Sequence, residues 1–188
     1  MTSEAHSVLV VTKDQKISSL ISVMLVQPLF DLKIVQDFNE ARRCCAEQFF
    51  NIIIADSASG EGVDFAIDMA DSSSVILVLV PSQNFDQTSY RVEPYGILTL
   101  STPFDQFYFY NMMKVAIAVN YKIKTLTSQT LRLKEKMEEI RLINRAKMLL
   151  MQNLSMTEEN AHRYIEKEAM NRCVKKLSIA EEVIKTYS

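Results

Sequence analysis

The sequence predicts an open α/β domain with a doubly wound parallel sheet, then a long helix and a small all-helical domain. Strand-length apolar runs alternate with helix-length amphipathic segments over the first 120 residues. No glycine or proline follows Pro103, so a helix that begins there meets no stop signal. The charge also changes along the chain. Residues 1–120 hold 7 basic and 14 acidic side chains, net −7, whereas residues 121–188 hold 14 and 9, net +5.

The strands of the first domain are short apolar runs, as expected for parallel strands buried on both faces. They are expected at Val8–Val11, Leu32–Val35, Ile52–Ala55, Val75–Val80 and Gly96–Leu100. Helices are expected at Gln15–Leu25, from an Asn39 cap to Gln48, at Val63–Ala70 after a Ser57–Gly62 loop, and from Phe104 onward. Repeated strand–helix units of this length predict a parallel sheet with helices on both faces.

The composition excludes several classes of protein. Three glycines cannot form a Walker loop or a GxGxxG turn. Two histidines provide no metal cluster with the cysteines, of which Cys44 and Cys45 are adjacent and Cys173 is distant, so a disulfide framework is also excluded. No nucleophile–base pair is evident, so no enzyme is predicted. Since no apolar run approaches the ~20 residues of a membrane span, we expect a cytoplasmic protein without a membrane partner.

Polar side chains follow the predicted strands at their carboxyl ends, where ligands bind in doubly wound sheets. The candidate pocket residues are Thr12, Lys13 and Asp14 after the first strand, Asp56 after the third, and Thr102 and Pro103 after the fifth.

With Asp56 directly after Ile52–Ala55 and Pro103-Phe104 after the fifth strand, residues 6–120 resemble a response-regulator receiver domain of two-component systems, a flavodoxin-like fold. The resemblance implies phosphorylation of the aspartate at position 56, Mg²⁺ bound by two acids after the first strand, and a lysine before the proline. Here Thr12-Lys13 replace the acid pair and Thr102 replaces the lysine. The strand-four hydroxyl has no clear counterpart, since Leu79-Val80 occupy its expected place.

These departures predict a degenerate pseudo-receiver over residues 1–120, in which Asp56 is phosphorylated weakly or not at all. Lys13 is a candidate partner for Asp56 and would then mimic or block the phosphorylation switch. No cofactor is predicted, and Mg²⁺ is expected only if the pocket is still competent.

Two columns of a seven-residue repeat follow, namely Ala116, Ile123, Thr130 and Met137, and Val119, Leu126, Leu133 and Ile140. Such a repeat predicts a coiled-coil linker over residues 121–140 and a homodimer. The alternative is a long helix packed on its own first domain. The dimer seam is expected to contain Ile123, Leu126, Leu133, Met137 and Ile140.

Residues 141–188 predict three short helices, the first of which continues to about Met151. Ser155–Glu158 and Ser178–Glu181 match capping boxes for the second and third helices. The side chains expected to face inward are Ala161, Tyr164, Ile165 and Ala169 in the second helix, and Ala180, Val183 and Ile184 in the third.

The spacing of Ala146-Lys147, Leu150-Met151, Ala161, Ala169-Met170 and Ala180 resembles that of the ANTAR domain, the RNA-binding output module of transcription antitermination regulators. One departure is Met148, where the family commonly has glycine. The resemblance implies a three-helix RNA-binding domain, and clustered Lys and Arg suit phosphate contacts. The predicted RNA-binding residues are Arg145, Lys147, Arg163, Lys167, Asn171, Arg172, Lys175 and Lys176, with Tyr164 as a further candidate for base stacking.

The sequence thus predicts a dimeric, response-regulator-like antiterminator that stabilises a hairpin in a nascent leader RNA. Two alternatives stay open. One is a phosphorylation-dependent two-component response regulator with a nucleic-acid-binding output, and the other is a non-enzymatic protein-interaction module. The expected partners are leader RNA hairpins, a second copy of the chain, and a sensor or sequestering protein.

Overall fold

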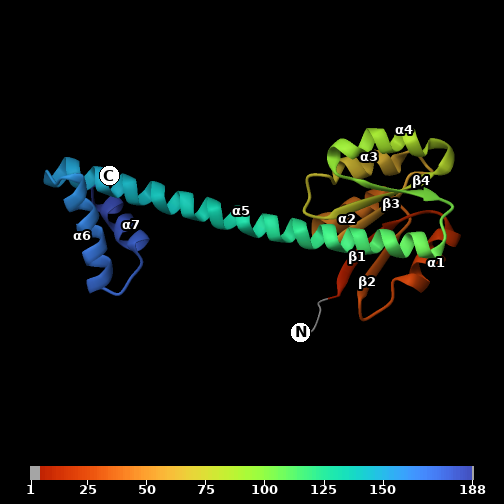
Figure 1. Ribbon diagram of the computed structural model, residues 1–188, viewed down its shortest axis with the longest axis horizontal. Helices are drawn as coiled ribbons and strands as arrows, with labels where there is room; N and C mark the ends of the chain where they lie inside the picture. The colour runs from red at the N-terminus through yellow and green to blue at the C-terminus, as the bar shows by residue number, and fades with distance from the viewer. Residues whose placement is uncertain (1–4, 188) are drawn as a thin grey trace. The chain divides into compact units, whose positions relative to one another are not determined.

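The computed structural model describes residues 5–187 and divides into two compact units, with the boundary between Leu126 and Thr127 (Figure 1). The first unit contains a sheet of five strands, all parallel, in the order β2-β1-β3-β4-β5. The strands are β1 (His6–Val11), β2 (Phe30–Val35), β3 (Ile52–Asp56), β4 (Val75–Pro81) and β5 (Leu98–Thr102). The predicted doubly wound fold is confirmed.

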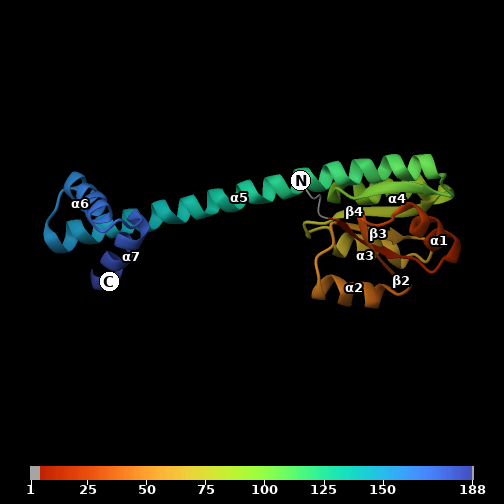
Figure 2. The ribbon, with the colours of Figure 1, turned by 90° about the horizontal axis from the view of Figure 1, so that it is seen from below.

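Helices cover both faces of this sheet (Figures 1 and 2). The helices of the first unit are α1 (Gln15–Met24), α2 (Phe38–Glu47), α3 (Glu61–Asp68), α4 (Phe85–Val92) and the first part of α5 (Gln106–Leu154), with two short 3₁₀ turns, η1 (Ser82–Asn84) and η2 (Glu93–Tyr95). Alternation along β1 sends Leu9 and Val11 into a core with α2, α3 and α4. Val8 and Val10 enter a second core with α1 and α5.

Several predicted element boundaries are wrong. The cap of α2 is Asp37, not Asn39, because its carboxylate accepts a hydrogen bond from the Glu40 backbone N–H at 3.1 Å. Strand β5 begins at Leu98, since Gly96 adopts a left-handed backbone (φ 70°) that closes η2. Asp105 accepts from the backbone N–H of Tyr108, so α5 starts at Gln106 and not at Phe104.

The second unit contains the later part of α5, followed by α6 (Glu158–Asn171) and α7 (Lys176–Tyr187). Its core is formed by apolar side chains of all three helices, and four of these are alanines, which allow the helices to approach closely. The buried residues are Ala146, Leu150, Ala161, Ile165, Ala169, Ile179, Ala180 and Val183. Ile184 packs against them, as expected, but Tyr164 is 40% exposed and does not face inward.

Neither predicted capping box is present. Thr157 caps α6, with its hydroxyl accepting from the Asn160 backbone N–H at 3.2 Å, while Ser155 has a left-handed backbone (φ 53°) in the preceding turn. Helix α7 already begins at Lys176, so Ser178 lies inside its first turn. Both helices form where the apolar spacing predicts them, and only their first residues differ.

Helix α5 carries the predicted seam residues. Ile123 packs partly against the core of the first unit. The other four remain exposed, with Leu126 at 48%, Leu133 at 63%, Met137 at 70% and Ile140 at 52%. We call Leu126, Leu133, Met137 and Ile140 the seam stripe. Among the described residues, no helix combines the length and apolar character needed to cross a lipid bilayer.

Candidate functional site

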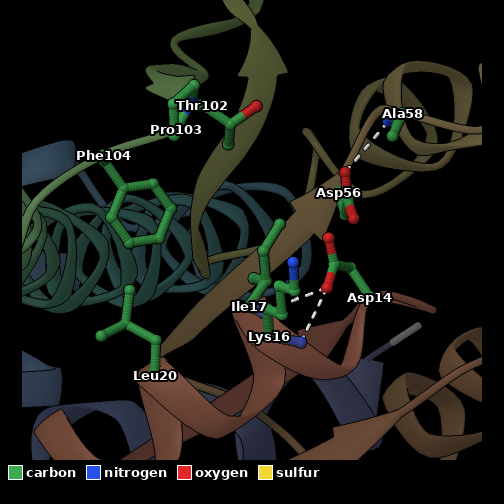
Figure 3. Close-up of a pocket in the computed structure, with 9 residues that line it drawn as sticks. All are labelled: Asp14, Lys16, Ile17, Leu20, Asp56, Ala58, Thr102, Pro103 and Phe104. Carbon is green, nitrogen blue, oxygen red and sulfur yellow. Dashed lines mark hydrogen bonds between the residues drawn. The ribbon is translucent and has the colours of Figure 1, made fainter.

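The first candidate site is a cavity of about 350 Å³ at the carboxyl ends of β3 and β5, beside the start of α1 (Figure 3). Asp56 ends β3 and is only 7% exposed. Its Oδ2 accepts a hydrogen bond from the Thr12 hydroxyl at 2.7 Å, and its Oδ1 accepts one from the Ala58 backbone N–H at 3.0 Å. A glycine is required at position 62, because a Cβ there would lie 2.2 Å from the Asp56 carbonyl oxygen.

The predicted partner of Asp56 is wrong. Thr12 is 3% exposed and points its hydroxyl at the carboxylate, whereas Lys13 is exposed and forms no ion pair with it. Thr12 directly follows β1 with its side chain buried, whereas the exposed Lys13 lines a neighbouring pocket with Asp56 without forming an ion pair with it. The Asp56 carboxylate therefore accepts hydrogen bonds but forms no ion pair with a described cation.

Asp14 has a structural role at the start of α1. Its Oδ1 accepts from the backbone N–H groups of Lys16 and Ile17, at 2.7 and 3.4 Å, which caps the helix. Figure 3 shows the Asp14 and Asp56 carboxylates pointing toward one another, with Ile17 and Phe104 on the apolar side of the cavity.

This donor set does not fit Mg²⁺. The ion prefers near-octahedral oxygen ligation, with carboxylates free to coordinate. Among the described residues, two carboxylates line the cavity, those of Asp14 and Asp56, and one oxygen of Asp14 is already engaged in capping α1. Within residues 5–187, no group of three or more His, Cys, Asp or Glu side chains could hold a metal ion.

The remaining predicted pocket residues also differ from a phosphoryl-transfer site. Thr102 lines the cavity at the position where the receiver resemblance implies a lysine in contact with the phosphoryl group, and the proline after it, Pro103, is retained. The first hydroxyl beyond β4, that of Ser82, is hydrogen-bonded to the Ser101 hydroxyl at 2.9 Å and to the Thr102 carbonyl at 2.8 Å. It is held against β5 and is not part of the cavity lining. Lys16 lines the cavity and Lys13 lines the adjoining pocket beside Asp56, but neither forms an ion pair with this buried carboxylate.

The second candidate site is the polar surface of the second unit, where most of the predicted RNA-binding cations are ion-paired. Arg163 pairs with Glu159 at 2.6 Å, and Arg172 binds both oxygens of Glu182 at 2.6 and 2.7 Å. Lys176 pairs with Glu166. The arginine at 172 lowers the pKa of the Glu182 carboxyl, and Lys176 does the same for Glu166.

Lys147 differs from the other predicted RNA contacts. Its side chain is 15% exposed, and its ammonium group donates to Glu158 at 2.9 Å, which joins α5 to the first turn of α6. Glu158 also stabilises the N-terminus of that helix through the helix dipole. The contact favours a structural role for Lys147 over a phosphate contact.

Lys175 forms no salt bridge with a described residue and lines two adjoining grooves of the second unit. The first, of about 510 Å³, is bounded by Arg132 and Lys136 of α5. The second, of about 640 Å³, contains the exposed side chain of Met170 and the half-exposed Val174. We treat these two adjoining grooves as one surface of each chain and call it the basic groove. The groove adds Arg132 and Lys136 to the candidate RNA-binding residues. The sequence prediction did not include them, because in the heptad pattern they are only charged residues beside the seam.

The other predicted residues lie on the same unit without a common site. Lys167 and Asn171 are exposed on α6, and Arg145 is exposed on α5. Tyr164, half-exposed on α6, has an aromatic face that a base could stack on. These residues remain predicted RNA contacts.

The comparisons with known proteins address each unit separately. Residues 131–184 match the ANTAR domain family. A search of curated proteins finds no match.

Solved structures match the first unit. The chain is similar to the signal receiver domain of an HD domain-containing protein from Pseudomonas fluorescens, with a TM-score of 0.60 and 14% identity over 66% of this chain and 96% of that one. It is similar to NtrX from Brucella abortus, with a TM-score of 0.59 and 13% identity, covering 66% of this chain but only 29% of that one. A CheY-like response regulator receiver domain protein from Methanospirillum hungatei gives a TM-score of 0.56 and 15% identity over 63% and 98%. At these identities the likeness shows the fold.

Proposed function

We propose that this chain, which joins an N-terminal domain of the receiver fold to a C-terminal ANTAR domain, is a dimeric RNA-binding regulator that acts in transcription antitermination. The observation that carries the proposal is the ANTAR match over residues 131–184, which spans all eight residues of the second unit's buried core. A protein that binds one RNA fold stabilises that fold by mass action, so it can favour an antiterminator hairpin over a terminator.

The basic groove supports a phosphate-binding role beside the recognition surface. Arg132, Lys136 and Lys175 line it without a salt bridge to a described glutamate, although Glu135 and Glu139 also belong to its lining. An RNA phosphate can bind such cations without first displacing a carboxylate partner. Exposed ion pairs such as Arg163–Glu159 contribute only ~0–1 kcal/mol, so these cations can also exchange their partner for RNA.

The seam stripe supports the dimer. Leu133, Met137 and Ile140 are each more than half exposed in the single chain. The two groove cations that lie on α5, Arg132 and Lys136, occupy other heptad positions than the stripe, and Lys175 lies in the turn before α7. Pairing of two copies along the seam stripe would therefore leave the basic groove of each copy open to RNA.

The test is a binding series with the full chain and a pool of RNA hairpins whose loops are randomised. Unstructured RNA and duplex DNA of equal length serve as competitors. We expect hairpins with particular loop sequences to be enriched, since RNA sequence is read mainly from unpaired bases. Equal affinity for hairpins, unstructured RNA and duplex DNA would overturn the proposal and favour the protein-interaction module.

A second experiment tests whether the basic groove binds RNA phosphates. Lys136→Ala and Lys175→Ala together should weaken binding to all hairpins alike and reduce the slope of log affinity against log salt by about 1 per lost phosphate contact. The matched control is Lys33→Ala with Lys122→Ala, which removes two exposed lysines from the first unit. Equal effects of the two double variants would show that only the overall charge matters.

We propose that phosphorylation of Asp56 does not control this regulator. The Asp56 cavity contains no group of Mg²⁺ ligands, and Thr102 stands where a lysine would contact the phosphoryl group. Control by a sensor or sequestering protein, or by the amount of the regulator, is the proposed alternative.

A further inference from the structure

A cavity of about 250 Å³ in the first unit is separate from the Asp56 site. It lies between α1, the start of β2 and the first turns of α5. Its inner wall contains Leu25, Phe109 and Met113, which are at most 5% exposed and belong to the core on that face of the sheet. Leu29 is 60% exposed and also lines the cavity, so the cavity has an accessible edge.

Aromatic rings form one side of the cavity. The His6 ring lies 6.0 Å from that of Phe30 and 5.7 Å from that of Tyr121, which it meets edge to face. The backbone N–H of His6 donates to the Leu29 carbonyl at 2.8 Å, so the strand edge holds this histidine in place. Ring-lined walls of this kind suit a flat or branched apolar group.

Lys114 provides the charge at this cavity. Its ammonium group lies 5.2 Å above the Tyr110 ring, a cation–π contact that holds it beside the cavity. The described residues that line the cavity include no aspartate or glutamate, and Lys114 forms no salt bridge within residues 5–187. Burial, and secondarily the charge of Lys124, lowers the pKa of His6, which keeps that ring neutral at pH 7.

We propose that this cavity binds a small carboxylate with an apolar body about the size of one ring. A cavity of ~150 Å³ accommodates benzene, so about 250 Å³ leaves room for a ring with a short acid side chain. The apolar wall would bury the ring, and Lys114 would pair with the carboxylate. The site is independent of RNA binding, and it gives the receiver-fold domain a ligand other than a phosphoryl group.

The experiment uses the full chain with ¹³C-labelled methionine methyl groups. Met24 and Met113 line the cavity, while Met137 and Met170, on the second unit, serve as internal controls. The probes are phenylacetate, phenylacetamide and phenethylammonium, which share a ring and differ in charge. We expect phenylacetate to shift only the Met24 and Met113 signals, with a Kd of about 1 mM. It should bind about fivefold tighter than the amide, and the ammonium compound should bind weakest.

Variants identify the two parts of the site. Lys114→Met should remove the preference for the carboxylate over the amide, whereas Lys122→Met, on an exposed position of the same helix outside the cavity, should keep it. Ile117→Trp should fill the cavity and abolish binding of all three probes. Since Ile117 touches the core, Leu29→Trp provides a second filling variant at the exposed edge.

Three results would overturn the proposal. One is the absence of any shift at Met24 and Met113 with several millimolar phenylacetate. Another is equal binding of the three probes, and the last is an equal loss in the Lys114 and Lys122 variants. Because none of these measurements involves RNA, their outcome leaves the proposed antitermination function untouched.

Discussion

Replacing Leu133 by glutamate should dissociate the proposed dimer. Burying a leucine side chain contributes about 1.5–3 kcal/mol, and 63% of Leu133 is exposed in the single chain. Two copies meeting at this position therefore contribute about 2–4 kcal/mol. Facing glutamates add repulsion of about 1 kcal/mol. The combined loss of roughly 3–5 kcal/mol corresponds to an increase in the dimer Kd of at least about 100-fold.

Leu131→Glu is a matched control for this change. Leu131 is 55% exposed, lies on the same helix two residues away and falls outside the heptad columns. Both substitutions exchange leucine for glutamate, which have similar helix propensities, so neither should unfold α5. Only the substitution in the seam stripe should change the association state.

Sedimentation velocity of the two variants and the parent chain, from about 1 to 100 μM, measures the effect. The parent and Leu131→Glu should sediment mainly as dimers across this range, and Leu133→Glu should be mainly monomeric at its low end. A monomeric parent chain at the highest concentration, or identical behaviour of the two variants, would refute the assignment of the seam stripe.

Three further outcomes are expected. Acetyl phosphate with Mg²⁺ should change neither the association state nor RNA affinity. Stoichiometric phosphate on Asp56 by mass spectrometry, together with tighter RNA binding, would contradict this. Asn120→Ala should destabilise the first unit by about 1–2 kcal/mol in urea unfolding, because its buried amide donates to the Asn51 carbonyl at 2.9 Å; the exposed Asn111→Ala should have little effect. Because Arg172 lowers the pKa of Glu182, that ion pair should stabilise the second unit above pH 4.5 and lose its effect as acid protonates Glu182. Glu182→Gln should flatten this part of the melting-temperature profile, and an unchanged profile would exclude a contribution from the pair.

The parallel sheet could be predicted from the sequence because its central strands, β1, β3 and β4, are buried on both faces. Continuous apolar runs such as Val75–Val80 leave few other structures for a segment of that length. Helix α4 gives no such pattern. Only Ser89 and Val92 of it are buried, so its polar residues do not show a helical period and the sequence prediction left this helix out.

The contacts of the candidate sites were harder to predict, because they depend on which side chains the folded chain brings close together. The sequence offered Lys13 as a candidate partner of Asp56, yet the buried Thr12 donates its hydroxyl to the carboxylate at 2.7 Å. Likewise, Arg172 pairs with Glu182 across the turn between α6 and α7. A pair of residues ten positions apart on two different helices cannot be predicted from the period of one helix. The cations could therefore be found from the sequence, but their acidic partners could not.

On helix α5, the side chains proposed for dimerisation differ from those proposed for RNA binding. No glycine or proline interrupts it between Gln106 and Leu154, so helical periodicity fixes which of its side chains share a face. Arg132 and Lys136 belong to the basic groove, while Leu133 and Met137 belong to the seam stripe. A dimer joined along the stripe would carry two grooves. Two hairpins in one transcript would then be bound more tightly than one, because binding of the first raises the effective concentration of the second.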